Sequence, residues 1–141
     1  MKDCFEKRLL KRGGPDLLKS EKALEISKKN LAKSESLMKH GFHSEAIIAA
    51  YTAMFQSARA LLFRDGIFER SHYCVVEYLK ENYVKNHLLT NEFLYTINVY
   101  GTQRHEVLYR LEEISFEESE VKDALAKAKK FIKTISQMLV R

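Results

Sequence analysis

The sequence predicts an all-α domain, and three observations carry that prediction. Ala, Leu, Glu and Lys, which favour helices, are abundant, whereas the 141 residues include five Gly and one Pro. Apolar residues recur with helical spacing in five segments, which short turn sequences separate. The hydrophobic share of 45% is sufficient for a core. We therefore expect a single domain over 1–141: an antiparallel up-and-down bundle of four to five main helices over about 16–140, after a short basic helix over about 3–12.

The first two expected helices lie in the N-terminal part of the chain. Residues 3–12 form the short helix, which Gly13-Gly14-Pro15 ends. Asp16 is the expected N-cap of the second helix, which runs to about His40. Apolar residues recur every seven positions in it and predict a narrow buried stripe at Leu17, Leu24, Leu31 and Met38.

The third expected helix is the most apolar segment and the predicted centre of the core. Ser44 is its expected cap, and it runs to about Arg64. Tyr51 and Phe55 lie on its large apolar face, where packing is a more common role than ligand binding. A stripe of small residues allows another helix to approach closely, at Ala46, Ala50, Ala53, Ser57 and Ala60.

Three further helices complete the expected bundle. Ser71 caps one over 72–84, after a turn at Asp65-Gly66. The next covers 91–113 and can bend at Gly101. The last covers 117–140, and its predicted buried side consists of Val121, Leu125, Ala128, Ile132, Ile135 and Leu139.

The fifth expected helix carries a cation on an otherwise apolar face. At about 100° per residue, Arg104 falls near the middle of that face, where a guanidinium is costly unless it is paired or opens into a cleft. Three interpretations stay open: a surface Arg on a helix that is rotated differently, an ion pair with a carboxylate such as Glu45 or Glu77, or a functional Arg at a cleft. His105 and Tyr109 share a nearly opposite face. The apolar face itself comprises Phe93, Ile97, Tyr100, Val107, Leu108 and Leu111.

Positive charge is concentrated at the N-terminus. Residues 1–40 hold 11 Lys or Arg against 6 Asp or Glu, whereas residues 41–141 hold 13 of each. The excess indicates either a surface that faces nucleic acid or a solvated helix. Aromatic residues that would accompany single-strand binding are not interleaved with these cations in the sequence.

The sequence lacks the motifs that mark several kinds of site. The chain has no phosphate-binding Gly-rich loop, HExxH, CxxC or nucleophile elbow, and we expect no cofactor. His40 and His43 lack a third ligand nearby, so we expect no metal. We expect Cys4 and Cys74 to be free thiols. The sequence has no run of about 18 apolar residues and no signal peptide, which predicts a cytoplasmic protein without membrane contact.

Two stretches carry a family resemblance. The run AIIAAYTAMFQSARALLFRDGIFERSHYCVVEYL over 46–79, followed by RHEVLY over 104–109, resembles a HEPN (higher eukaryotes and prokaryotes nucleotide-binding) domain, and the similarity extends over about 16–139. The resemblance implies a helical bundle, often a homodimer. Many members are metal-independent ribonucleases with an Arg-x4–6-His motif, and many stand beside a small MNT-type nucleotidyltransferase as toxin and antitoxin.

The motif can be transferred only in part. The resemblance makes Arg104 the motif Arg and His105 the polar residue that often follows it. The motif His would stand at 109, 110 or 111, where this chain has Tyr109, Arg110 and Leu111. Tyr there resembles a variant branch that departs from the ribonuclease motif. With a pKa near 10, Tyr is a poor base at neutral pH, whereas His is well suited.

Three functions follow from these residues. The first is a nucleotide- or RNA-binding module, the toxin-like half of a pair with a nucleotidyltransferase, with a site at Arg104, His105 and Tyr109 that His72 approaches. By resemblance, Tyr109 is then a candidate target of nucleotide transfer. The second is an active metal-independent endoribonuclease that uses Arg104 and His105. The third is an interaction module without site chemistry, in which Arg104 is ion-paired within its own chain.

Overall fold

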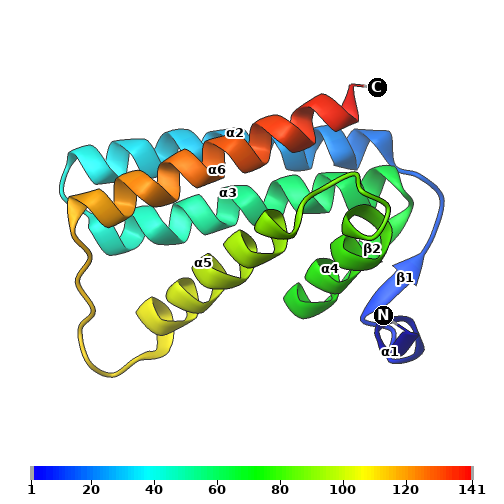
Figure 1. Cartoon of the computed structure of the whole chain (residues 1–141), viewed down its shortest axis with the longest axis horizontal. Coiled ribbons are helices and arrows are strands. Elements are labelled where there is room, and N and C mark those ends of the chain that lie inside the picture. The colour runs from blue at the N-terminus through cyan, green and yellow to red at the C-terminus, as the bar shows by residue number, and fades with distance from the viewer. Residues whose placement is uncertain (1, 141) are drawn as a thin grey trace.

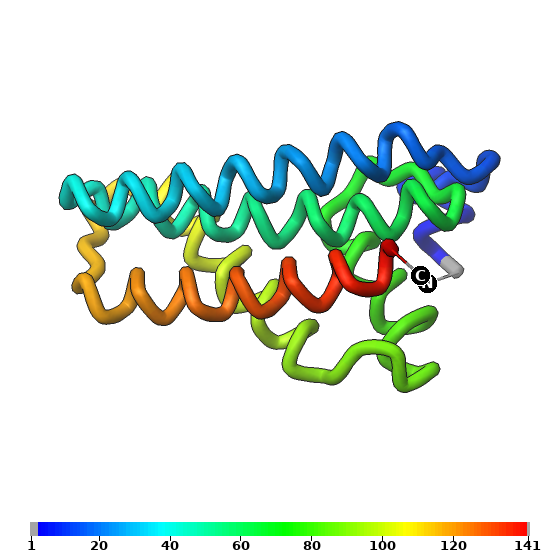
Figure 2. Tube along the Cα trace, turned by 90° about the horizontal axis from the view of Figure 1, so that it is seen from above, coloured from blue at the N-terminus to red at the C-terminus, as the bar shows by residue number. Residues whose placement is uncertain are grey.

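The computed structural model describes residues 2–140, in which helices dominate. Helices α2 (Leu17–Lys39), α3 (His43–Arg64) and α6 (Glu118–Leu139) lie side by side along the long axis (Figures 1 and 2). Helices α4 (His72–Leu79) and α5 (Asn91–Tyr109) pack against the other side of α3. The predicted all-α bundle is therefore confirmed, and α3 is at its centre, as expected.

Small residues hold α2 against α3. The stripe predicted on α3 is buried throughout, and α2 meets it with serines rather than leucines. Three hydroxyls spaced seven residues apart each donate a 2.7 Å hydrogen bond to an α3 carbonyl, in the pairs Ser20–Ala60, Ser27–Ala53 and Ser34–Ala46. The predicted leucine stripe is wrong at its start, because Leu17 is 66% exposed.

The predicted helix over 3–12 is wrong in its second half. Helix α1 covers only Lys2–Glu6, and the chain then forms strand β1 (Leu10–Arg12). Strand β1 pairs antiparallel with β2 (Ile67–Glu69), and Leu10 lies opposite Glu69. The partner strand lies more than fifty residues away in the sequence, so local periodicity could not reveal this ladder.

The cysteines correct another prediction. Cys4 in α1 and Cys74 in α4 form a disulfide, with Cα atoms 5.8 Å apart, and are not free thiols. Both residues are buried. The bond ties the N-terminal segment to α4 across a sequence separation of 70 residues.

The helix ends agree with the sequence in most places. Asp16 caps α2, Ser71 caps α4, and Glu117 forms a capping box with Glu120 at the start of α6. Ser44 does not cap α3; its hydroxyl donates to the carbonyl of Ile114 instead. The predicted helix over 72–84 continues from α4 into a π-helix over Lys80–Val84, and the helix predicted to reach 113 ends at Tyr109.

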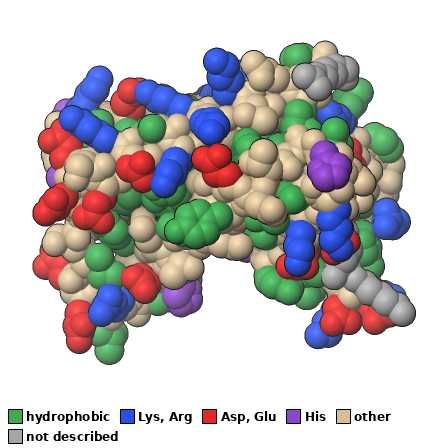
Figure 3. Space-filling view, viewed as in Figure 1, with side chains coloured by type: hydrophobic (Ala, Val, Ile, Leu, Met, Phe, Trp, Pro, Cys, Tyr) green, Lys and Arg blue, Asp and Glu red, His purple; other side chains and the backbone are tan. Residues whose placement is uncertain are grey.

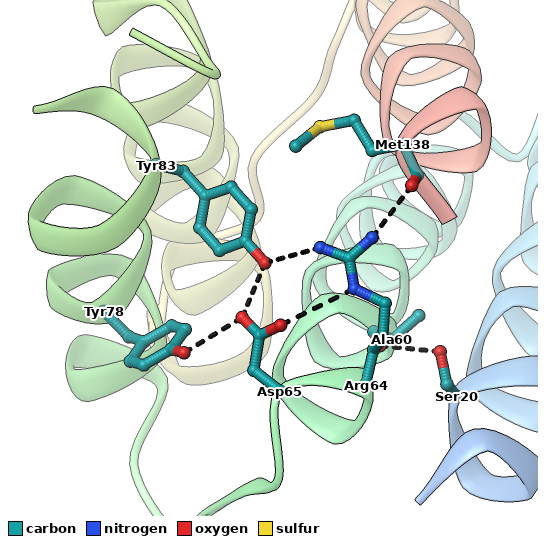
Figure 4. Close-up of polar contacts among 7 residues, drawn as sticks. All are labelled: Ser20, Ala60, Arg64, Asp65, Tyr78, Tyr83 and Met138. Carbon is teal, nitrogen blue, oxygen red and sulfur yellow. Dashed lines mark hydrogen bonds and ion pairs between the residues drawn. The ribbon is translucent and has the colours of Figure 1, made fainter. Parts of the chain in front are cut away.

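A polar network at the end of α3 joins this helix to α4, to the π-helix that follows α4, and to α6 (Figure 4). The Asp65 carboxylate accepts hydrogen bonds from the hydroxyls of Tyr78 and Tyr83. Arg64 lies beside Asp65, donates to the Tyr83 hydroxyl and donates a 2.8 Å bond to the Met138 carbonyl at the end of α6. The network anchors α4 and the following π-helix to the bundle, and so positions one wall of the site described below.

Within residues 2–140, one helix is long and apolar enough to cross a membrane by length and composition. It is α3, and 78% of its most apolar window is buried inside the fold. This is the pattern of a central core helix.

Candidate functional site

A cleft opens where α5 diverges from α4. Its volume is about 540 Å³, and α3 forms its floor. The outline of the molecule has a notch at its lower edge (Figure 3), in the region where Figure 1 shows the end of α5 apart from α4. The lining brings together all four residues predicted for the site, namely His72, Arg104, His105 and Tyr109.

Arg104 is half-buried and forms no ion pair within residues 2–140. Neither Glu45 nor Glu77, the carboxylates considered from sequence, pairs with it. Its guanidinium carbon lies 5.8 Å from the centre of the Tyr51 ring, a cation–π contact. Since most of its donors are not used by neighbours in the described chain, Arg104 can bind an anion in the cleft.

Gly101 allows Tyr51 to reach this position. A Cβ atom at Gly101 would lie 3.1 Å from Tyr51 Cε1, closer than an ordinary contact. Residue 101 therefore has a packing role, and α5 is continuous through it from Asn91 to Tyr109.

His72 faces Arg104 from the first turn of α4. Its Nδ1 lies 2.9 Å from the Tyr51 hydroxyl, and its ring stacks on Phe55 with centroids 3.9 Å apart. Burial lowers the pKa of His72, and the positive charge of Arg104 lowers it further. The imidazole is therefore neutral at pH 7, with Nε2 available as the second nitrogen.

His105 and Tyr109 form the exposed rim of the cleft. Their rings lie 4.7 Å apart, which confirms that they share a helix face. Although the helical wheel places this face nearly opposite that of Arg104, both side chains line the same cleft as Arg104, where the predicted site put them. The bundle leaves the end of α5 uncovered, so its different faces border one open space: Leu108 is 45% exposed and Tyr109 65% exposed.

Sequence reasoning missed the α3 residues that support the cleft. Tyr51 and Phe55 are buried, as expected for packing residues, yet they also hold the His72 ring, and Tyr51 lies under Arg104. The signal available in the sequence was their four-residue spacing on a helix with Arg59 and Phe63.

The arrangement offers anion binding and proton transfer. Arg104 supplies a permanent cation, His72 a neutral imidazole, and Tyr51 a hydroxyl whose pKa is raised by burial and which therefore stays protonated. Among the described residues, no group of three or more His, Cys, Asp or Glu side chains could hold a metal ion.

Comparison with known families identifies the chain. The model of the HEPN domain matches residues 20–138, nearly the whole sequence. The chain belongs to the HEPN family. At the level of the family it is a nucleotide- or RNA-related module, and HEPN domains commonly act as dimers. No curated protein matches the chain closely enough for comparison.

HEPN membership agrees with the sequence resemblance, and the structure adds the surroundings of the motif region. Arg104 lies in the cleft, and its rim holds His105 and Tyr109, the latter where the motif His is expected. A second histidine lines the cleft, since α4 supplies His72.

Proposed function

We propose that this HEPN domain binds a nucleotide or the backbone of an RNA in the cleft, with a phosphate on Arg104. The observation that carries the proposal is a half-buried guanidinium that has no carboxylate partner in the described chain and borders an open cavity. A phosphate oxygen accepts bidentate hydrogen bonds from an Arg, and a partly dry site strengthens them. His72, His105 and Tyr109 line the space around that phosphate.

The affinity of the Arg104→Ala variant for a dinucleotide tests the proposal. Fluorescence anisotropy with a labelled dinucleotide should give an affinity about 10- to 100-fold weaker than wild type, since a hydrogen bond to a charged group is worth about 1.5–3 kcal/mol. Arg110→Ala is the matched control: Arg110 is exposed, pairs with Glu106 and Glu112, and does not line the cleft. Equal affinities for wild type and Arg104→Ala would exclude this site.

An active metal-independent endoribonuclease is the second candidate. It is supported by two imidazoles, His72 and His105, that border the same cleft as Arg104. RNA cleavage without metal needs a base for the 2′-OH and an acid for the leaving oxygen, and imidazoles can serve as both. Arg104 would stabilise the charge that develops on the phosphate.

Cleavage in EDTA separates this candidate from binding alone. Wild-type activity that is lost in Arg104→Ala and His105→Ala but kept in Tyr109→Phe would establish a ribonuclease that acts without the motif His. Absence of cleavage by a folded protein that still binds RNA would leave the binding module.

The toxin-like role with an MNT-type nucleotidyltransferase is the finer part of the proposal. Tyr109 supports it, since its side chain is 65% exposed at the rim of the cleft and a transferase could reach it. Incubation with a nucleotidyltransferase of this type and ATP should add one nucleotide to wild type and none to Tyr109→Phe, as measured by intact mass. Modification of both proteins would exclude Tyr109 as the acceptor.

A homodimer through the end of α5 completes the proposal. Leu108 is 45% exposed and Leu111, just after the helix, is fully exposed, and a second copy could cover this apolar end. Sedimentation should give a dimer for wild type and a monomer for Leu108→Lys/Leu111→Lys. The plain interaction module, which requires an ion-paired Arg104 and no cleft, has less support from these contacts.

A further inference from the structure

We propose that the ligand is a single-stranded RNA whose chain continues from the cleft along α3 to the first turn of α2. The proposal rests on the proposed function of the cleft and extends it from one phosphate to a strand. We call this path the α3 groove, and its principal residues are Arg104, Tyr51, His72, Arg59, Lys19 and Lys22.

Three adjoining cavities form the α3 groove. The cleft shares Tyr51, His72 and Arg104 with a second cavity of about 450 Å³. The second cavity shares Arg59 and Glu69 with a third of about 320 Å³, which reaches α2. Because each cavity shares lining residues with the next, the three hollows adjoin one another along α3.

The floor of the groove follows one edge of α3. Tyr51, Phe55, Arg59 and Phe63 recur every four residues and so lie on one side of the helix. Twelve residues at about 1.5 Å each span about 18 Å. About five stacked nucleotides cover that length at about 3.4 Å each, so a dinucleotide is too short to reach from one end to the other.

Cations alternate with rings at the α2 end. The Arg59 guanidinium lies 5.0 Å from the centre of the Phe63 ring. Lys19 Nζ lies 5.9 Å from the Phe63 ring and 5.2 Å from the Phe68 ring, and Lys22 lines the same cavity. The ammonium groups can bind phosphates, and the half-buried Phe68 ring offers a surface on which an unpaired base can stack, whereas Phe63 is buried. Cations beside an accessible ring are how proteins bind single strands.

The charge of the groove fits a polyanion. Four cations line it, and the one carboxylate among the lining residues, Glu69, is held in an ion pair with Arg59. Lys19 and Lys22 belong to the N-terminal forty residues that carry the excess positive charge. The aromatic rings that this stretch lacks in sequence are supplied in space by α3 and β2.

Two ligands and two double variants test the path. Anisotropy would compare a labelled dinucleotide with an oligouridylate of about 12 nucleotides, across a salt series. Lys19→Ala/Lys22→Ala should bind the dinucleotide like wild type but the longer RNA at least about tenfold more weakly. The slope of log K against log[salt] should fall by about 1.4, because each lost phosphate contact on a single strand contributes about 0.7.

Lys28→Ala/Lys39→Ala is the matched control. Both residues are exposed on α2 and line none of the three cavities, and their substitution removes the same charge. Longer RNA bound equally by the two double variants would overturn the path while leaving the cleft intact. Loss of dinucleotide binding in Lys19→Ala/Lys22→Ala would also overturn it. A wild type that binds neither RNA would overturn the proposed function as well.

Discussion

At the scale of single residues, the site depends on how Arg104 acts on His72. Burial and the nearby guanidinium both favour the neutral imidazole, and the Arg59 charge acts in the same direction, while Glu69 opposes them. The folded chain therefore binds fewer protons at His72 than the unfolded chain does. The contribution of His72 to stability is present in full above its ordinary pKa of 6.5 and falls as pH decreases from there toward the lower folded value.

Arg104→Ala should raise the pKa of His72. Removal of the Arg104 charge leaves burial as the main cause of the shift, so the pKa of His72 should move toward 6.5 without reaching it. An NMR titration of the imidazole signals would measure the change. His40 serves as the internal control for the signals, since its Nδ1 contacts the Ser36 carbonyl and it does not line the cleft. An unchanged His72 would mean that the two groups are not neighbours in solution.

At the scale of elements, the α2–α3 pair depends on small residues. Ser27 is fully buried and its hydroxyl bonds the Ala53 carbonyl. Ser27→Ala should lower the free energy of unfolding by about 1 kcal/mol, the worth of one hydrogen bond. Ser27→Leu should cost at least about 1–3 kcal/mol more, because its extra atoms force two closely packed helices apart. Urea denaturation monitored by circular dichroism would measure both.

Leu17→Ala provides the comparison for that series. Heptad spacing predicts Leu17 as a buried residue, whereas the structure exposes it, so its truncation should change stability by no more than about 0.5 kcal/mol. A cost for Leu17→Ala that exceeds the cost of Ser27→Leu would reverse the assignment of the buried face.

The same elements explain what the sequence could predict. Helix boundaries were predictable where a local cap exists, as at Asp16 and Ser71. The serine stripe was not, because periodicity was judged on large apolar residues. At the site, Arg104 stood out as a cation on an apolar stripe, but the sequence could not tell a cleft from an ion pair. Whether the end of α5 is covered depends on how α4 packs, which is a tertiary property.

At the scale of the whole molecule, the disulfide and the short sheet fix the N-terminal segment to the cleft wall. Cys74 lies two residues after His72, and β2 leads directly into the capped start of α4. Disulfides are rare in reducing compartments outside hyperthermophiles. The bond is therefore unusual for a cytoplasmic protein, and the predicted cytoplasmic location stays a prediction. The bond also makes stability depend on redox conditions.

Reduction should destabilise the fold by about 4 kcal/mol. This is the loop-entropy value for a bond that closes about 70 residues, and the reduced chain gains that freedom when it unfolds. Urea denaturation with and without dithiothreitol should show a lower midpoint in the reduced protein. Cys4→Ala/Cys74→Ala should unfold near the reduced midpoint and no longer respond to dithiothreitol. A wild type with the same midpoint in both conditions would mean that the two thiols are not bonded in solution, and α4 would then be held by the Asp65 network and its packing alone.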